Sequence, residues 1–285
     1  MLNRVWWLLI AVTPFLAGPA AAQTGTLDRI RTSGVITMGY LENSAPFSFL
    51  DESRQPQGFS IDLCRAIASG IRSQLKLANL ETRWVGLTIQ NRLEAVASGK
   101  VDIECSTTTW TFSRQMLVDF SLITFLDGGS ILTRAESKVA RIGDFSGKRV
   151  AVITGTTTEK VLRSTLARRD IKAEVVTVGN RAEGLKLLDD TKVDGFASDR
   201  TALIGIVLGT KTGHSFKLLD EDFSVEQYAL ALPRGDIEFR LAVNRVLARL
   251  FRTGGIQQIY DQWLGKLGPP SLLLSATYFI QGISE

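Results

Sequence analysis

The chain has 285 residues, of which 45% are hydrophobic and 22% are charged, and its formal net charge is +4. This composition is typical of a soluble globular protein with one large or two medium domains. The basic residues are scattered rather than gathered among aromatic ones, so a nucleic-acid partner is not expected. The single histidine, His214, cannot build a metal site or a Ser-His-Asp triad. We therefore expect neither a metal nor a cofactor.

Residues 1–22 have the pattern of a secretory signal peptide. Arg4 precedes an apolar run that starts at Val5, and the small residues Ala20 and Ala22 stand before the expected cleavage point. An uncleaved anchor is the alternative, but the run is shorter than the roughly 20 apolar residues that a membrane span needs. We expect cleavage before Gln23 and a mature protein in the periplasm.

An α/β unit follows. Strands are predicted over 34–40, 80–86 and 100–104, with helices over 58–71 and 88–99 between them. Such alternation favours a parallel-type sheet with helices on its faces.

A second, similar unit opens near Arg141. Its predicted strands are 147–155, 173–178 and 193–199, and its predicted helices are 157–170 and 181–190. A strand over 228–236 and helices over 237–252 and 255–264 follow it. The repetition is one of architecture rather than of sequence, so we expect two lobes and not a true repeat.

The two cysteines, Cys64 and Cys105, leave two alternatives open. An oxidising compartment allows a disulfide between them. Cys64, however, lies on the apolar stripe of the helix predicted over 58–71, where a buried thiol packs as a small hydrophobic group. We expect two free buried thiols, with a bridge as the alternative.

Hydroxyl-rich loops leave the ends of two predicted strands. "CSTTTWTFSRQ" occupies residues 105–115, and "ITGTTTE" occupies residues 153–159. Ligands of open α/β sheets lie beyond the carboxyl ends of the strands. Hydroxyls, backbone N–H groups at a helix start and the guanidinium of Arg114 suit a carboxylate. A phosphate would fit similarly, but neither loop has the glycine-rich pattern with a lysine that nucleotide sites use.

Asp199 ends a third predicted strand. An acid that faces a carboxylate site repels the ligand unless the ligand also carries a positive group, and a carboxylate plus an ammonium make an amino acid. Each feature alone has a plainer explanation, since threonine runs form turns and acids at strand ends serve as caps. Their coincidence at three strand ends favours a binding site.

The chain also resembles a known family, the periplasmic solute-binding proteins of polar amino-acid ABC importers. The stretches that carry the resemblance are "APFSF", "GFSIDLCRAIA", "QNRLEAVASGKVDIECSTTTWTFSRQ", "DFS", "FSGKRVAVITGTTTE" and "IYDQWLGKLGPP". They are similar to glutamate/aspartate-binding and general L-amino-acid-binding proteins. The resemblance implies a type II fold, in which two α/β lobes joined by two hinge strands close over the ligand. It implies a discontinuous first lobe (23–131 and 230–285), a second lobe (132–229) and crossings near 129–133 and 228–232.

The resemblance also implies roles for residues of the first lobe. Arg114 matches the arginine that holds the ligand α-carboxylate, and Thr107 and Thr109 match loop positions at the same ligand. Arg92 matches an arginine directed at a side-chain carboxylate, and a structural role for it is the alternative. Phe47 falls where an aromatic ring often covers the ligand.

In the second lobe, Thr154 and Thr156 match the ligand loop, and Asp199 matches the acid that receives the α-ammonium. Two positions depart from the glutamate/aspartate pattern. Leu41 replaces a second side-chain arginine, and Arg181 stands roughly where a histidine is usual. The resemblance therefore implies amino-acid binding, while the identity of the ligand side chain stays open.

The expected function is capture of a polar or acidic L-amino acid, such as glutamate, aspartate or their amides, by a monomer that delivers it to an inner-membrane ABC permease. The alternative is an enzyme, because some relatives of this fold are cyclohexadienyl dehydratases, which need a general acid in the cleft. Glu104 and Glu159 are the strand-end carboxylates available for that role, and Glu159 more simply caps a helix. We expect a binding protein and not an enzyme.

Overall fold

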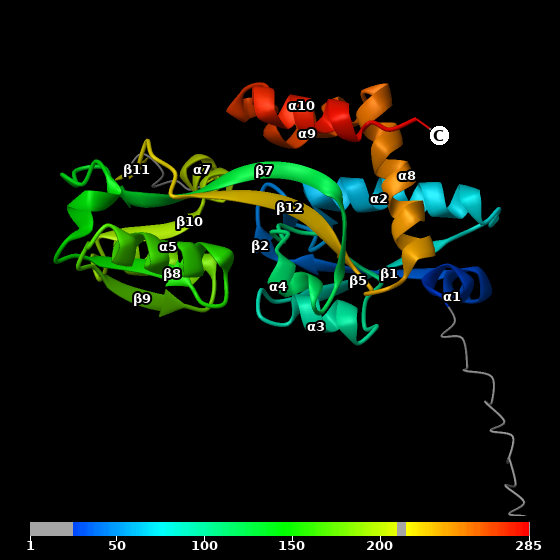
Figure 1. Ribbon diagram of the computed structural model, residues 1–285, viewed down its shortest axis with the longest axis horizontal. Coiled ribbons are helices and arrows are strands. Elements are labelled where there is room, and N and C mark those ends of the chain that lie inside the picture. The colour runs from blue at the N-terminus through cyan, green and yellow to red at the C-terminus, as the bar shows by residue number, and fades with distance from the viewer. Residues whose placement is uncertain (1–24, 210–214, 285) are drawn as a thin grey trace, which may run out of the picture.

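The protein consists of two lobes that are joined by two long strands (Figure 1). The computed structural model describes residues 25–209 and 215–284, so the predicted signal peptide and His214 lie outside the described residues. The joining strands are β7 (Asp119–Arg134) and β12 (Ser224–Leu232), which pair antiparallel along most of their length. Both predicted crossings lie within them. The predicted two-lobed α/β architecture is confirmed.

The larger lobe contains the N-terminal and C-terminal parts of the described chain (Figure 1). Its strands are β1 (Val35–Leu41), β2 (Asn43–Ser44), β3 (Ser48–Leu50), β4 (Pro56–Gln57), β5 (Glu81–Leu87) and β6 (Ile103–Glu104). Its α-helices are α1 (Thr26–Ser33), α2 (Phe59–Gln74), α3 (Arg92–Ala97), α4 (Phe112–Gln115), α8 (Ile237–Thr253), α9 (Gly255–Leu264) and α10 (Leu272–Gln281). A 3-10 turn, η3 (Gly265–Leu267), follows α9.

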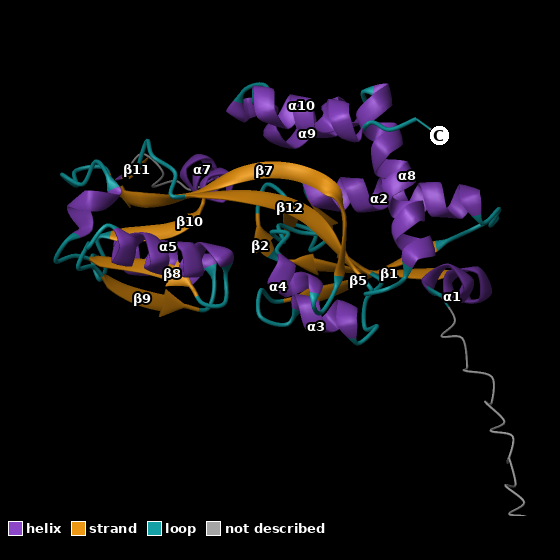
Figure 2. Ribbon diagram, in the orientation of Figure 1, coloured by secondary structure: helices purple, strands orange, loops and turns teal. Residues whose placement is uncertain are grey.

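The smaller lobe is built from the middle of the chain (Figure 1), and Figure 2 shows that it contains both strands and helices. Its strands are β8 (Arg149–Ile153), β9 (Glu174–Val178), β10 (Gly195–Asp199) and β11 (Phe216–Leu218). Its helices are η1 (Ile142–Phe145), α5 (Thr157–Arg168), α6 (Arg181–Asp189) and α7 (Arg200–Gly209).

One continuous sheet runs through both lobes, because the joining strands belong to it. The strand order is β5-β1-β6-β12-β7-β10-β8-β9, with β11 paired to β7. Within this sheet, the pairs inside each lobe, such as β1 with β5 and β8 with β9, are parallel, whereas β7 and β12 pair antiparallel with their neighbours. The strands β2, β3 and β4 form a separate antiparallel sheet. The parallel strands therefore end at the junction of the lobes, where their loops meet.

Separate apolar cores stabilise the lobes. In the larger lobe, the apolar stripe of α2 packs with α8, α9 and the strands. In the smaller lobe, buried residues of β8 and β10 pack beneath α5 and α6. The helix α2 begins after Gly58. Gly58 has a φ of 128°, and a Cβ there would come within 2.3 Å of the Phe47 carbonyl oxygen, so only glycine fits.

The expectation of two free thiols is wrong, because Cys64 and Cys105 form a disulfide. The buried face of α2 lies over the end of β6, which brings the two Cα atoms to 6.2 Å, a normal separation for a bridge. Both residues are fully buried. The reasoning from the apolar stripe placed Cys64 correctly in the core, but it had no information on what faces it.

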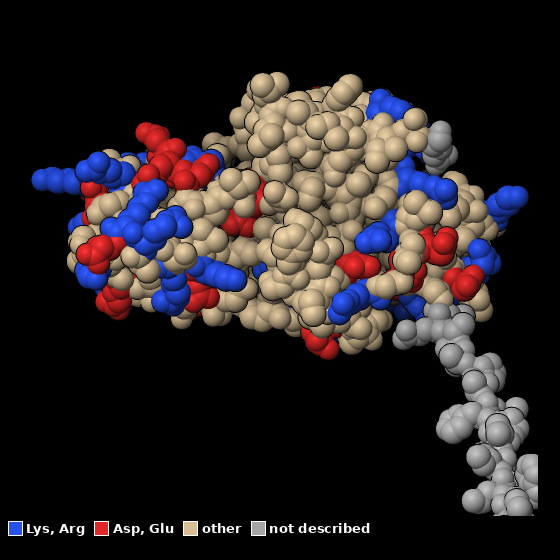
Figure 3. Space-filling view, viewed as in Figure 1, with Lys and Arg blue, Asp and Glu red and all other residues tan. Residues whose placement is uncertain are grey.

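The helix α10 was not predicted from the sequence. It packs on the larger lobe through Leu274 and Tyr278, and the Tyr278 hydroxyl donates to the backbone oxygen of Thr124 (2.8 Å). Its outer side is apolar and exposed, with Leu272 at 87% and Phe279 at 86% exposure. Figure 3 accordingly shows a largely uncharged surface over α9 and α10. Across residues 25–209 and 215–284, no helix has the length and apolar character needed to cross a membrane.

Candidate ligand-binding site

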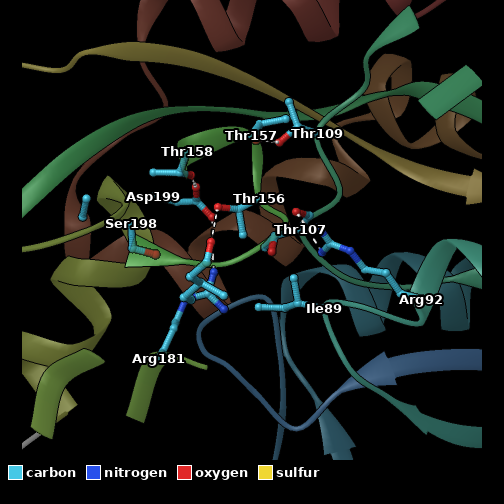
Figure 4. Close-up of a pocket in the computed structure, with 12 residues that line it drawn as sticks. Ile89, Arg92, Thr107, Thr109, Thr156, Thr157, Thr158, Arg181, Ser198 and Asp199 are labelled. Atoms are coloured by element: carbon cyan, nitrogen blue, oxygen red, sulfur yellow. Dashed lines mark hydrogen bonds and ion pairs between the residues drawn. The ribbon is translucent and has the colours of Figure 1, made fainter. Parts of the chain in front are cut away.

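A small polar pocket lies where the loops of the two lobes meet (Figure 4). Its empty volume is about 350 Å³, including the solvent at its mouth. The residues that line it are Ile89, Arg92, Thr107, Thr109, Ile153, Thr156, Thr157, Thr158, Arg181, Ala197, Ser198 and Asp199. Six of the predicted site residues are among them, and they lie at strand ends or in the loops and helix starts that follow strands of both lobes.

The hydroxyls of the threonine tract alternate between two sides. The chain is extended after β6, so successive side chains point in opposite directions. Ser106 and Thr108 both donate to the buried carboxylate of Glu104, whereas Thr107 and Thr109 face the pocket. Ser106 and Thr108 therefore satisfy a buried acid of the larger lobe, whereas Thr107 and Thr109 lie on the ligand side of the tract, where the Thr109 hydroxyl donates to Glu226 (2.7 Å).

Two arginines of the larger lobe lie beside this tract. Arg92, at the start of α3, is 4% exposed, and its Nη1 donates to the Thr107 carbonyl oxygen (3.4 Å). Its Nε has no partner among the described residues, and burial lowers its pKa. Arg114, on α4, donates from Nη1 to the Thr109 carbonyl oxygen (2.8 Å) and lies outside the pocket lining. Burial and the nearby Arg92 lower the pKa of Arg114 to about 10, so Arg114 stays protonated at neutral pH.

The smaller lobe supplies an acid and a third arginine. Asp199, at the end of β10, accepts a hydrogen bond from the Thr158 hydroxyl (3.1 Å) at Oδ1. Its Oδ2 forms an ion pair with Nη2 of Arg181 (3.2 Å). Nη1 of Arg181 donates to the hydroxyl of Ser44 in the larger lobe (2.6 Å). The predicted receptor of the ligand ammonium is thus already paired with a cation.

Thr156 caps α5, where its hydroxyl accepts from the Glu159 backbone N–H (3.1 Å). Three further predicted residues lie away from the pocket lining. Thr154 is exposed at the surface of its loop. Phe47 is fully buried and packs edge to face against Phe125 and Tyr228, with ring centroids 5.0 and 5.5 Å apart. Arg114, described above, is the third predicted residue that does not line the pocket.

Two acids of the joining strands were missed by the sequence reasoning. Glu226 is 1% exposed, and its Oε2 accepts from the hydroxyls of Thr109 (2.7 Å) and Thr157 (2.8 Å), one from each lobe. Asp127 accepts from the Tyr228 hydroxyl (3.2 Å), and burial beside Asp199 raises the pKa of Asp127 to about 7. Neither acid ends a strand, so the strand-end rule could not find them. Thr157 and Thr158 were visible in "TGTTTE" and could have been included.

Comparison with known proteins identifies the family. Residues 36–266 match the family described as "Bacterial extracellular solute-binding proteins, family 3". The chain belongs to this family. The match covers both lobes and both joining strands, and it stops before α10.

Individual relatives of this solute-binding protein span most of its length. It is 30% identical over 262 residues to the "L-glutamate/L-aspartate-binding protein" of Pseudomonas aeruginosa, covering 91% of this chain and 87% of that one. It is 27% identical to the "Glutamate/aspartate import solute-binding protein" of Escherichia coli, covering 90% and 84%.

Solved structures have the same fold. One is described as "the ancestral amino acid-binding protein AncCDT-1, a precursor of cyclohexadienyl dehydratase". The TM-score to it is 0.74 at 28% identity, covering 84% of this chain and 99% of that chain. The solute-binding fold predicted from the sequence is therefore confirmed.

Proposed function

We propose that this solute-binding protein captures an acidic or polar L-amino acid between its lobes and delivers it to an inner-membrane ABC permease. The observation that carries the proposal is the pocket, where Arg92, Arg181 and Asp199 gather among threonine hydroxyls. Buried charges of both signs suit a zwitterion, because each end of the ligand finds a partner of opposite charge. The names of the Pseudomonas and Escherichia relatives support glutamate or aspartate.

The ligand orientation that we propose follows the roles implied by the family resemblance. The α-carboxylate is directed at Arg114, Thr107 and Thr109, through hydroxyl or backbone groups, and the α-ammonium is directed at Asp199. Arg92, whose Nε lacks a partner among the described residues, is directed at the side chain of the ligand. Thr156 contributes from the smaller lobe, and Thr154 and Phe47 shape the surroundings of the site.

Processing and assembly form part of the same proposal. The signal peptide is removed before Gln23, and the mature protein works in the periplasm as a monomer. Its larger lobe comprises residues 23–131 and 230–285, and its smaller lobe comprises residues 132–229. The strands β7 and β12 act as the hinge on which the lobes close.

The enzyme alternative gains no support from its candidate acids. Glu104 faces away from the pocket and accepts from two hydroxyls of its own tract. Glu159 accepts from the Gly155 backbone N–H (2.9 Å) and pairs with Arg163 (3.0 Å). Neither carboxylate lines the pocket, so neither is placed to protonate a bound substrate.

A thermal-shift screen of the twenty L-amino acids tests the proposal. A ligand at about 100 times its dissociation constant adds about 2.7 kcal/mol to the free energy of unfolding, so glutamate or aspartate should raise the melting temperature clearly. D-glutamate is the matched control, because its ammonium and carboxylate cannot meet Asp199 and Arg114 in the same pose. If no L-amino acid raises the melting temperature, the proposed function is wrong.

A further inference from the structure

Arg181 connects the two lobes and at the same time occupies the acid of the site. Its guanidinium spans from Oδ2 of Asp199 in its own lobe (3.2 Å) to the hydroxyl of Ser44 in the larger lobe (2.6 Å). Arg181 is 7% exposed and Asp199 is 9% exposed, so water screens their attraction little. Figure 4 shows the Arg181 side chain pointing toward Asp199.

A ligand ammonium that approaches Asp199 therefore meets a cation already bound there. Oδ1 of Asp199 accepts from Thr158 (3.1 Å), and Oδ2 holds Arg181. Two cations on one buried carboxylate repel each other, and the second one loses its hydration without a full counter-charge. The ligand must displace Arg181, or provide something that makes its displacement favourable.

We propose that Arg181 is an internal competitor for Asp199, which only ligands with a side-chain carboxylate displace efficiently. Binding is an exchange: the ligand ammonium takes Asp199, and the released guanidinium pairs with the side-chain carboxylate of the same ligand. This inference rests on the proposed function, and it narrows the ligand class to dicarboxylic amino acids over their amides.

The donors for this exchange are present in the pocket. The Nε atoms of Arg181 and Arg92 are buried and have no hydrogen-bond partner within the described chain. Both side chains line the pocket, one from each lobe. A carboxylate between them has two acceptor oxygens for the two guanidiniums, whereas an amide offers one acceptor oxygen and an NH₂ group that cannot accept. An amide ligand leaves Arg181 without the counter-charge that it had on Asp199.

Calorimetry with glutamate and glutamine on wild-type protein and Arg181→Gln tests the exchange. A competitor that leaves Asp199 available for about one tenth of the time weakens the apparent affinity about tenfold. Arg181→Gln should therefore bind glutamine about tenfold more tightly than wild type does, while the preference for glutamate falls by at least about tenfold. Arg181→Lys is the matched control, because it keeps the competing charge and should not improve glutamine binding.

Arg181→His gives a second test, which does not depend on whether Arg181→Gln folds well. A neutral imidazole does not compete for Asp199, whereas an imidazolium does. Relative to wild type at each pH, this variant should bind glutamine more tightly at about pH 8 than at about pH 5.5.

Other outcomes overturn the proposal. If Arg181→Gln binds glutamine as wild type does, Arg181 contacts the ligand side chain but does not compete for Asp199. If Arg181→Gln loses the same factor in affinity for glutamate and for glutamine, Arg181 has only a structural role. If wild type binds no amino acid, the proposed function fails, and the exchange fails with it; if wild type binds glutamate normally, only the exchange is at stake.

Discussion

Removal of the disulfide should destabilise the protein strongly and loosen the ligand loop. The bridge joins Cys64 on α2 to Cys105, which immediately precedes the threonine tract. The variant to make is Cys64→Ala with Cys105→Ala, because it removes both sulfurs and leaves no unpaired thiol. Both positions are fully buried, so alanine introduces no polar group into the core.

The size of the effect follows from the loop that the bridge closes. The cysteines are 41 residues apart. The chain-entropy relation then gives an entropy difference of about 13 cal/mol/K, or about 4 kcal/mol at room temperature. A loss of this size corresponds to a fall in melting temperature on the order of 10 °C for a protein of this length.

Urea unfolding of wild type and the double variant measures the loss, and wild type unfolded in a reducing agent is the control. The reduced wild type should lose about as much stability as the variant, since the loop constraint disappears in both. Ligand affinity should also fall in the variant, because Thr107 lies two residues after the lost anchor at Cys105. A stability loss below about 1 kcal/mol would refute the argument that the bridge acts through the unfolded chain.

Three further predictions concern the ligand, the acids and the hinge. Arg114→Lys keeps the charge but loses the bidentate fork, so calorimetry should show at least about a hundredfold weaker ligand binding; the exposed Arg163→Lys is the control and should bind normally. Burial beside Asp199 raises the pKa of Asp127 from 3.8 to about 7. The contribution of protonated Asp127 to the free energy of unfolding is therefore fully present below about pH 4 and is lost as the pH rises through about 7. Asp127→Asn should therefore be more stable than wild type in urea above pH 7, by up to a few kcal/mol, and the difference should vanish toward pH 4. Saturating ligand should reduce the radius of gyration in small-angle scattering, since each lobe supplies part of the site, and an unchanged radius would contradict closure.

The parts of the site that follow strand ends could be predicted from the sequence. Thr107, Thr109, Thr156 and Asp199 all line the pocket, because the carboxyl ends of parallel strands lie at the same edge of a sheet. Local periodicity is enough to place such residues, since it requires only that the strands and their directions be recognised.

Features that depend on contacts between distant segments could not be predicted in this way. Glu226 meets Thr109 across 117 residues of sequence, and Cys64 meets Cys105 across 41. The strand β7 was recognised only as a crossing. Its buried positions come first in pairs and then in a run of six, so it lacks the period of two that marks a strand. Its partner β12 contains a register irregularity at Ala229, which no local sequence pattern predicts.

The position of the arginines connects the choice of ligand with closure. Leu41 is buried against apolar neighbours of the larger lobe and supplies no charge to the site. The larger lobe therefore presents Arg92 to the pocket, and the smaller lobe presents Arg181. On the proposed exchange, a dicarboxylic ligand favours closure, because its side-chain carboxylate contacts both guanidiniums only when the lobes are closed. Under the proposed exchange, a neutral ligand leaves Arg181 on Asp199 and gives no such gain, so we expect the Arg181–Asp199 ion pair to affect both the choice of ligand and the closure of the lobes.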